Sequence, residues 1–192
     1  MKEKPKIRRE IKSEKLKIDE GYRYEASRSV MNKIESLKQF NEAKRVLLYN
    51  ALPDELPTEC MLNRWSKDKE LFLPVVKGEE LVIKKYSPEC MKVGAFGIKE
   101  PEGEEINIDT IDFIIVPGVA FDREHNRLGR GKGFYDRLLS QSKSFFVGIG
   151  YDIQVIDSVP TQPHDIKMNY IITEREILWK NMLCLLPAFL QD

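Results

Sequence analysis

The stretch IDFIIVPG, Ile111 to Gly118, decides the fold. Its apolar residues are almost uninterrupted, which is typical of a parallel strand at the centre of a sheet that is covered on both faces. We therefore predict a central β-strand here. In open α/β sheets ligands bind beyond the carboxyl ends of the strands, so the residues after Gly118 are the expected place for a site.

Strands and helices are predicted to alternate on both sides of this strand. Apolar runs of strand length occupy residues 45–50, 71–76, 80–86, 145–151 and 169–173. Helical periodicity covers residues 5–40, 58–67 and 131–140. The alternation predicts an α/β fold, with residues 1–192 forming a single domain in which helices cover both faces of a layered sheet.

Several local features are expected within this frame. The region 5–40 should form two helices that separate near Gly21, with Leu16 on the apolar side of the first. Thr58 is expected to cap the helix over 58–67, and a turn is expected at Lys77-Gly78. Residues 94–103 are predicted to be an unpaired loop, and the segments that resemble linkers are 99–109 and 159–163.

Composition excludes several classes of protein. The 192 residues carry 31 basic and 31 acidic side chains, which argues against a surface built for nucleic acid. No apolar run approaches the roughly 20 residues that cross a bilayer. The cysteines are odd in number and have no ligand spacing, which indicates reduced, mostly buried thiols: Cys60, Cys90 and Cys184. We expect a monomeric cytoplasmic protein that binds small molecules, and neither nucleic acid nor membrane.

The segment RLGRGKGFYDR, residues 127–137, combines glycines with cations. Glycines at 129, 131 and 133 bring backbone N–H groups close to an anion, and an arginine can contact two phosphate oxygens at once. Arg127, Arg130 and Lys132 supply the positive charges. The pattern predicts a phosphate-binding loop, although it matches neither of the well-known phosphate-binding motifs, GxxxxGK[ST] and GxGxxG. The alternative is that the segment is only a flexible surface loop.

Asp136 follows these cations. A carboxylate beside phosphate favours a divalent cation between them, and Mg²⁺ sites are usually built in this way. The alternatives for Asp136 are a salt bridge to Arg137 or a charge at a helix N-terminus. Of the neighbouring rings, Phe134 and Tyr135, at least one is expected in the core.

The whole string PGVAFDREHNRLGRGKGFYDR, residues 117–137, resembles the signature of the 5-formyltetrahydrofolate cyclo-ligase family. Other segments resemble this family in the expected order along the chain: KPKIRRE, YNALPDELPT, GAFGIKEP, VPTQPHD and YIIT. The resemblance implies a domain similar to the NagB/RpiA/CoA-transferase-like folds. It also implies an ATP-dependent, magnesium-requiring ring closure on a reduced folate.

The resemblance also implies roles for individual positions. ATP would be bound by Lys4, Arg8, Arg127, Leu128, Gly129, Arg130, Gly131, Lys132, Gly133, Phe134 and Tyr135. The folate would be bound by Asn50, Glu55, Arg130, Gly131, Lys132, Gly133 and Phe134. Asp136 and Asp165 would hold Mg²⁺. As a mechanism, we expect Lys132 and Arg130 to stabilise the phosphoryl group as it passes from ATP to the formyl oxygen, before N10 attacks.

Histidine occupies position 125, where the family usually has glycine. Histidine tolerates a left-handed backbone better than most residues, or Asn126 beside it could take that conformation instead, so we expect a modified hairpin turn and no catalytic base at His125. For His164 a structural hydrogen bond is expected, with support of the metal site as the alternative. Two other functions are considered: a sugar-phosphate isomerase or acyl-CoA transferase, which would need no ATP, and a small RNA-binding module.

Overall fold

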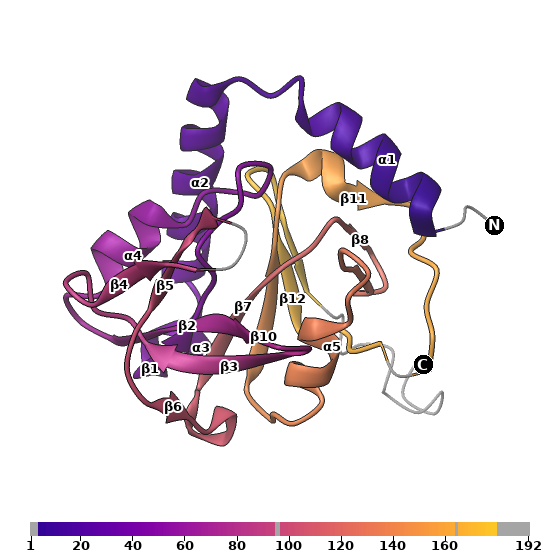
Figure 1. Ribbon diagram of the computed structural model, residues 1–192. Helices are drawn as coiled ribbons and strands as arrows, with labels where there is room; N and C mark the ends of the chain where they lie inside the picture. Colours follow the sequence, from indigo (N-terminus) through magenta and orange to yellow (C-terminus); the bar gives the residue numbers. More distant parts are fainter. Residues whose placement is uncertain (1–3, 95–96, 164, 180–192) are drawn as a thin grey trace, which may run out of the picture.

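The structure is a computed structural model that describes residues 4–94, 97–163 and 165–179 (Figure 1). Its largest sheet has eight strands in the order β13-β12-β10-β7-β1-β2-β3-β6. The parallel strands are β1 Arg45–Leu47, β2 Glu70–Lys77, β7 Phe113–Pro117, β10 Phe145–Ile149 and β12 Tyr170–Ile172. Antiparallel strands complete the two edges: β3 Glu80–Lys85, β6 Glu105–Ile106 and β13 Ile177–Trp179. The predicted central strand is confirmed as β7.

Alternate side chains of β7 enter two different cores. Phe113 and Ile115 pack in one cluster, and Ile114 and Val116 in the other. The first cluster includes residues of α2 Glu20–Glu35, α3 Lys38–Glu42 and α4 Glu59–Trp65, whereas the second includes residues of α5 Phe134–Leu139. Helices therefore cover both faces of the sheet, as predicted.

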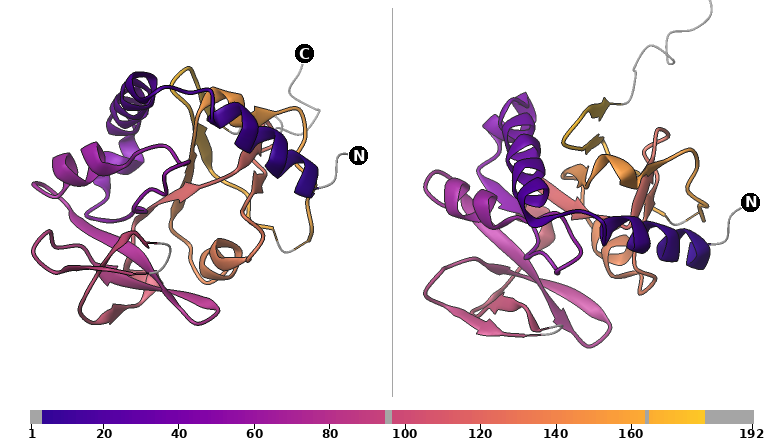
Figure 2. Two further views of the ribbon diagram at one scale, coloured as in Figure 1. Left: turned by 45° about the horizontal axis from the view of Figure 1, so that its top comes forward. Right: turned by 90° about the horizontal axis from the view of Figure 1, so that it is seen from above.

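The first helix, α1 Lys4–Lys15, packs away from these two cores. It lies along a small sheet made of β8 Ala120–Asp122, β9 Arg127–Leu128 and β11 Val155–Ile156. It also contacts the short helix η3 Asp152–Gln154, which directly precedes β11. Ile7 and Ile11 share a third apolar cluster with Val119, Leu128 and Val159. Figure 2 shows α1 running away from α2 toward the part of the molecule that holds β8. This packing brings the N-terminal cations to the segment that follows β9.

Two expectations for the N-terminal half are corrected. The break between the first helices falls at residues 16–19, because Asp19 caps α2 by accepting from the Tyr22 amide at 2.8 Å, and Leu16 is 77% exposed. Thr58 precedes α4 but does not cap it with its side chain. The hydroxyl of Thr58 donates instead to the Tyr49 carbonyl at 2.6 Å, which ties α4 to the end of β1.

The predicted unpaired loop and linkers are also corrected. Residues 94–103 include β5 Lys99–Pro101, which pairs with β4 Met91–Val93 in a separate two-stranded sheet. Both strands of such a sheet are edge strands, and an edge strand tolerates a proline such as Pro101 at its end. The segment 99–109 holds β5, β6 and the short helix η2 Ile108–Thr110. In the segment 159–163, Val159 is buried. The expected turn is confirmed by Gly78, whose φ is 62°.

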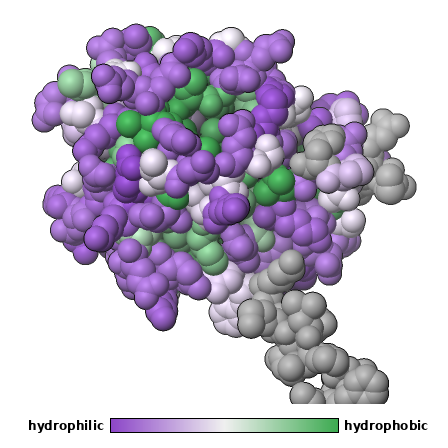
Figure 3. Space-filling model, turned by 90° about the horizontal axis from the view of Figure 1, so that it is seen from below, coloured by the Kyte–Doolittle hydropathy of each residue, from purple (hydrophilic) through white to green (hydrophobic). Residues whose placement is uncertain are grey.

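On the face seen from below, polar side chains predominate. Apolar side chains gather mainly in one area that polar ones surround, with smaller groups elsewhere on this face (Figure 3). Within the described ranges, no helix is long and apolar enough to cross a bilayer. Of the cysteines predicted to be buried, Cys60 is half-buried and Cys90 is exposed, which corrects the prediction for Cys90; Cys184 lies outside the described residues.

Candidate active site

A cavity of about 250 Å³ opens beyond the carboxyl ends of β1 and β7. The loop after β1, the β2–β3 hairpin and β5 form one part of its wall, which we call the sheet wall; it includes Tyr49, Asn50, Glu55, Val76 and Glu100. The other part is the glycine wall, formed by residues 127, 129, 130 and 132–136. The place predicted for a site from the central strand therefore holds a cavity.

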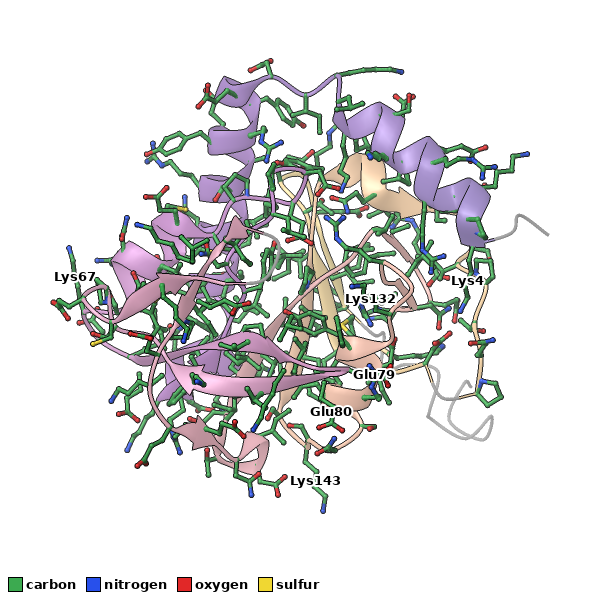
Figure 4. All side chains as sticks on the ribbon, viewed as in Figure 1. Lys4, Lys67, Glu79, Glu80, Lys132 and Lys143 are labelled. Atoms are coloured by element: carbon green, nitrogen blue, oxygen red, sulfur yellow. The ribbon has the colours of Figure 1, made fainter. Side chains whose placement is uncertain are left out.

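The glycine wall takes its shape from left-handed backbone. Gly131 has a φ of 103° and Gly133 a φ of 68°, conformations that side chains with a Cβ rarely adopt. The helix predicted from residue 131 therefore begins at Phe134, with Gly133 as its N-cap. Lys132 projects between these two glycines and is exposed, with its ammonium 5.6 Å from the centre of the Phe134 ring. Figure 4 shows Lys132 beside the ribbon that leads into α5.

The cations of α1 reach the same region. Arg8 donates from Nε to the Gly129 carbonyl at 2.9 Å, and Lys4 forms an ion pair of 3.2 Å with Asp165. The two residues lie four positions apart in α1, which is about one helical turn. They connect α1 to the glycine wall and to Asp165.

Arg130 crosses from the glycine wall to the sheet wall. Its Nε lies 3.1 Å from Glu55 Oε1, and its Nη2 bonds to Asp54, which also pairs with Lys15 at 3.1 Å. Burial acts to raise the pKa of Asp54, but the hydrogen bond from Arg130 and the charge of Lys15 outweigh it and lower the pKa. Burial lowers the pKa of Lys15.

Three tyrosines surround Glu55. Tyr49 donates its hydroxyl to the Leu56 carbonyl at 3.0 Å, and the Tyr151 hydroxyl lies 3.5 Å from the Glu55 carbonyl. Burial raises the pKa of Tyr151 to about 12 and also raises the pKa of Tyr49 and Tyr135. The hydroxyls are therefore neutral at physiological pH, and two of them fix the backbone that presents Glu55.

Arg127 is the member of the glycine wall whose guanidinium is buried. Its Nη2 donates to Asp136 Oδ1 at 2.7 Å and its Nη1 to the Pro117 carbonyl at 3.3 Å, whereas its buried Nε has no partner. The salt bridge considered for Asp136 therefore forms, but with Arg127 in place of Arg137. Arg137 donates to the Glu79 carbonyl.

Comparisons with known proteins agree with this geometry. The sequence profile of the 5-formyltetrahydrofolate cyclo-ligase family matches residues 1–174. The chain belongs to this family. A 5-formyltetrahydrofolate cyclo-ligase of Haemophilus influenzae is 34% identical over 173 residues, which are 84% of this chain and 92% of the relative. The family resemblance inferred from residues 117–137 is confirmed.

Two solved structures are similar to this cyclo-ligase family member. The 5,10-methenyltetrahydrofolate synthetase of Aquifex aeolicus superposes with a TM-score of 0.83 at 40% identity, over 91% of each chain. The synthetase of Mycoplasma pneumoniae, at 21% identity, has a TM-score of 0.75 and covers 90% of this chain and 99% of its own. This second likeness shows the shared fold.

The structure brings most of the residues predicted for this cyclo-ligase to one place. Asn50, Glu55, Arg127, Gly129, Arg130, Lys132, Gly133, Phe134, Tyr135 and Asp136 line the cavity. Leu128 is buried in the cluster beneath α1, so its side chain packs there. Asn50 donates from Nδ2 to the Lys99 carbonyl at 2.9 Å, which fixes β5 beside the cavity.

Three residues of the site were missed from the sequence. Glu100 lines the cavity and is 5% exposed, and Asp54 and Lys15 complete the ion pairs of Arg130. Asp54 had a visible signal, because it directly precedes Glu55. Glu100 lies in a segment predicted to be an unpaired loop, and Lys15 in a helix whose register was misjudged at Leu16.

The expected metal ligands are Asp136, which lines the cavity, and Asp165, which pairs with Lys4. Within the ranges that the structure describes, no group of three or more histidine, cysteine or acidic side chains is placed to hold a metal. Mg²⁺ often has only one or two carboxylate ligands and takes others from phosphate and water, so one carboxylate beside the glycine wall fits it. His164 lies outside the described residues.

Proposed function

We propose that the protein converts 5-formyltetrahydrofolate to 5,10-methenyltetrahydrofolate, with ATP converted to ADP and phosphate. The observation that carries this proposal is that the two walls of one cavity differ in chemistry. Cations and left-handed glycines form one wall, and two buried carboxylates, Glu55 and Glu100, lie in the other.

The glycine wall suits the triphosphate. Arg130 and Lys132 supply positive charge beside the left-handed glycines, and Arg8 and Lys4 extend this charge along α1. Arg127 has a different role in this proposal. Because its guanidinium is buried and bonded to Asp136, it stabilises the wall and holds Asp136 at the cavity.

The sheet wall suits the pterin of the folate. The aminopyrimidinone edge of a pterin carries N–H donors, and a carboxylate such as Glu55 can accept two of them. Leu52 already donates its amide to Glu55 Oε2 at 3.0 Å, so this carboxylate is held in place. Val76, Leu81 and Ile98 add apolar surface for the ring.

The chemistry begins when the formyl oxygen attacks the γ-phosphorus and the bond to ADP breaks. N10 then attacks the activated carbon, the carbon–oxygen bond breaks, and phosphate leaves. N10 loses its proton, so the products are the methenyl cation, ADP and hydrogen phosphate. Lys132 and Arg130 stabilise the charge on the transferred phosphoryl group, in the way typical of phosphoryl transfer.

Arg130 would stabilise the phosphoryl group during the reaction, but without ligands it is held in ion pairs. Its guanidinium contacts Asp54 and Glu55. A pterin bound to Glu55 would compete with Arg130 for that carboxylate. Folate binding would therefore leave Arg130 free to contact the transferred phosphoryl group.

We assign Mg²⁺ to Asp136 and Asp165. Bound there, Mg²⁺ would supply positive charge that neutralises part of the charge of the phosphates. Arg127 contacts Oδ1 of Asp136, so it can hold this carboxylate while Oδ2 binds the ion, whereas Asp165 would exchange its contact with Lys4 for one with the ion. We further propose that residues 1–192 form one domain and that the protein is a cytoplasmic monomer with no nucleic-acid or membrane partner.

The experiment that tests the proposal follows the near-ultraviolet absorbance of the purified protein with 5-formyltetrahydrofolate. Samples with MgATP, with Mg²⁺ alone and with ATP plus a chelator are compared. Methenyl product that appears only with MgATP, in a 1:1 ratio to ADP, is the expected result. Product without ATP would contradict the mechanism, and no product from folded protein that binds MgATP would contradict the choice of folate.

A further inference from the structure

The hairpin between β8 and β9 contains a buried carboxylate with four hydrogen bonds. Asp122 Oδ1 accepts from the amides of Glu124 and Asn126, both at 3.0 Å. Asp122 Oδ2 accepts from Asn126 Nδ2 at 2.9 Å and from the amide of Val159 at 2.8 Å. The first three bonds shape the turn, but the bond to Val159 reaches a segment 37 residues later.

His125 makes a second connection from the same turn. Among the residues that the structure describes, His125 is the one other than glycine that has a positive φ, which is 66°. Its side chain is buried. Its Nδ1 lies 3.2 Å from the Met168 carbonyl, and its own carbonyl accepts from the Met168 amide at 3.0 Å. A glycine would allow this backbone more easily, but it would lack the ring contact.

These bonds hold both ends of the segment that contains Asp165. Val159 is fixed by Asp122 and Met168 by His125, while Asp165 itself accepts from the Gln162 amide at 2.7 Å. The same hairpin continues through β9 into Arg127 and the glycine wall. One turn therefore connects Asp165 to the site of the proposed phosphate contacts.

We propose that Asp122 and His125 are positioning residues for MgATP. They set the place of Asp165 relative to the glycine wall. This inference rests on the proposed function for its ligand, but the connection itself is a property of the fold. Neither side chain lines the cavity, so each acts through the segment that it holds.

The test uses two variants and one control. An asparagine at position 122 has one acceptor oxygen, so Asp122→Asn cannot serve both the turn amides and Val159. His125→Gly allows the same left-handed backbone and removes the buried ring together with its contact to the Met168 carbonyl. Glu124→Gln, an exposed residue of the same turn, is the control.

We expect the KM for MgATP to rise about tenfold in Asp122→Asn, which is the size expected when a hydrogen bond to a charged group is lost. His125→Gly should raise it less, and the KM for 5-formyltetrahydrofolate should not change. Calorimetry with MgADP should show the same order of affinities. Amide hydrogen exchange at Val159 should accelerate in Asp122→Asn and at Met168 in His125→Gly.

The outcomes separate the possible failures. If both variants lower only the melting temperature, and leave MgADP affinity and the ratio of the two KM values unchanged, the hairpin has a purely structural role and the inference is wrong. If the wild type forms no methenyl product, the proposed function fails. Altered MgADP affinity together with faster exchange at Val159 and Met168 would then still support the positioning role.

Discussion

The two walls of the cavity are built in opposite ways. In the sheet wall the carboxylates are buried, with Glu55 9% and Glu100 5% exposed, and tyrosine hydroxyls and a backbone amide fix the loop around Glu55. In the glycine wall Lys132 is exposed and the backbone depends on left-handed glycines. The difference fits the proposed roles, in which the sheet wall holds the pterin in one place and the glycine wall adjusts around a phosphoryl group that moves.

The largest effect is expected from Lys132→Ala in the glycine wall. The turnover number should fall by about 100- to 1,000-fold, as when one preorganised stabilising group is removed, while the KM for the folate is unchanged. Single-turnover kinetics at saturating substrates would measure it. Lys143→Ala, which removes an exposed lysine outside the cavity, is the control. Near-normal turnover in Lys132→Ala would remove the distinction between the walls.

The matching change in the sheet wall is Glu55→Gln. Because the amide keeps only one acceptor, the KM for 5-formyltetrahydrofolate should rise about 10- to 100-fold, and the KM for MgATP should not. Steady-state kinetics with each substrate varied would show the split. The exposed Glu59 offers a control as Glu59→Gln. An equal rise in both KM values would mean that Glu55 serves the two ligands together.

A pair of glycines tests the adjustable backbone. Gly133 and Gly78 have similar φ values, 68° and 62°, so alanine should cost each about 1–2 kcal/mol of stability. A Cβ at Gly133 would lie 2.8 Å from Arg137 Nη1, whereas one at Gly78 would meet no atom within 4 Å. Gly133→Ala should also weaken MgADP binding. Thermal melts and calorimetry would separate the two effects, and equal MgADP binding by both variants would count against a special backbone at Gly133.

The smallest effect concerns Asp54, which joins the two walls through Arg130. The pKa of Asp54 is lowered in the folded protein, so its contribution to stability is complete above the unfolded value of about 4 and is lost as the pH falls through the folded value. The difference in the free energy of unfolding between wild type and Asp54→Asn, measured by urea unfolding, should shrink below pH 4. A gap that stays constant down to pH 2 would contradict this pairing.

The sequence was a good guide where one residue type has few possible uses. The apolar run of β7 has one suitable place in an α/β sheet, and closely spaced glycines with cations suit few ligands besides phosphate. Such patterns predicted the central strand and the glycine wall. Ion pairs such as Arg130 with Asp54 depend on which loops the fold brings together, and charge alone does not give the partner.

The errors have physical causes as well. Pro101 and its neighbouring glycines indicated an unpaired loop. A strand in a two-stranded sheet needs backbone hydrogen bonds on one side only, so β5 can form there. It brings Glu100 to the cavity. Thr58 has a side chain suited to capping, but its hydroxyl finds a better partner at Tyr49. In both cases a contact distant in sequence outweighed a local preference.

The first helix has a consequence for how the protein is made. Lys4 and Arg8 have partners 161 and 121 residues further along the chain, Asp165 and Gly129. Because α1 precedes both partners in the chain, it leaves the ribosome before they do. Its apolar Ile7 and Ile11 therefore have no cover from Val119, Leu128 and Val159 until those residues have been synthesised. During synthesis, the contact of Arg8 can form only after residue 129 has left the ribosome, and the contact of Lys4 only after residue 165.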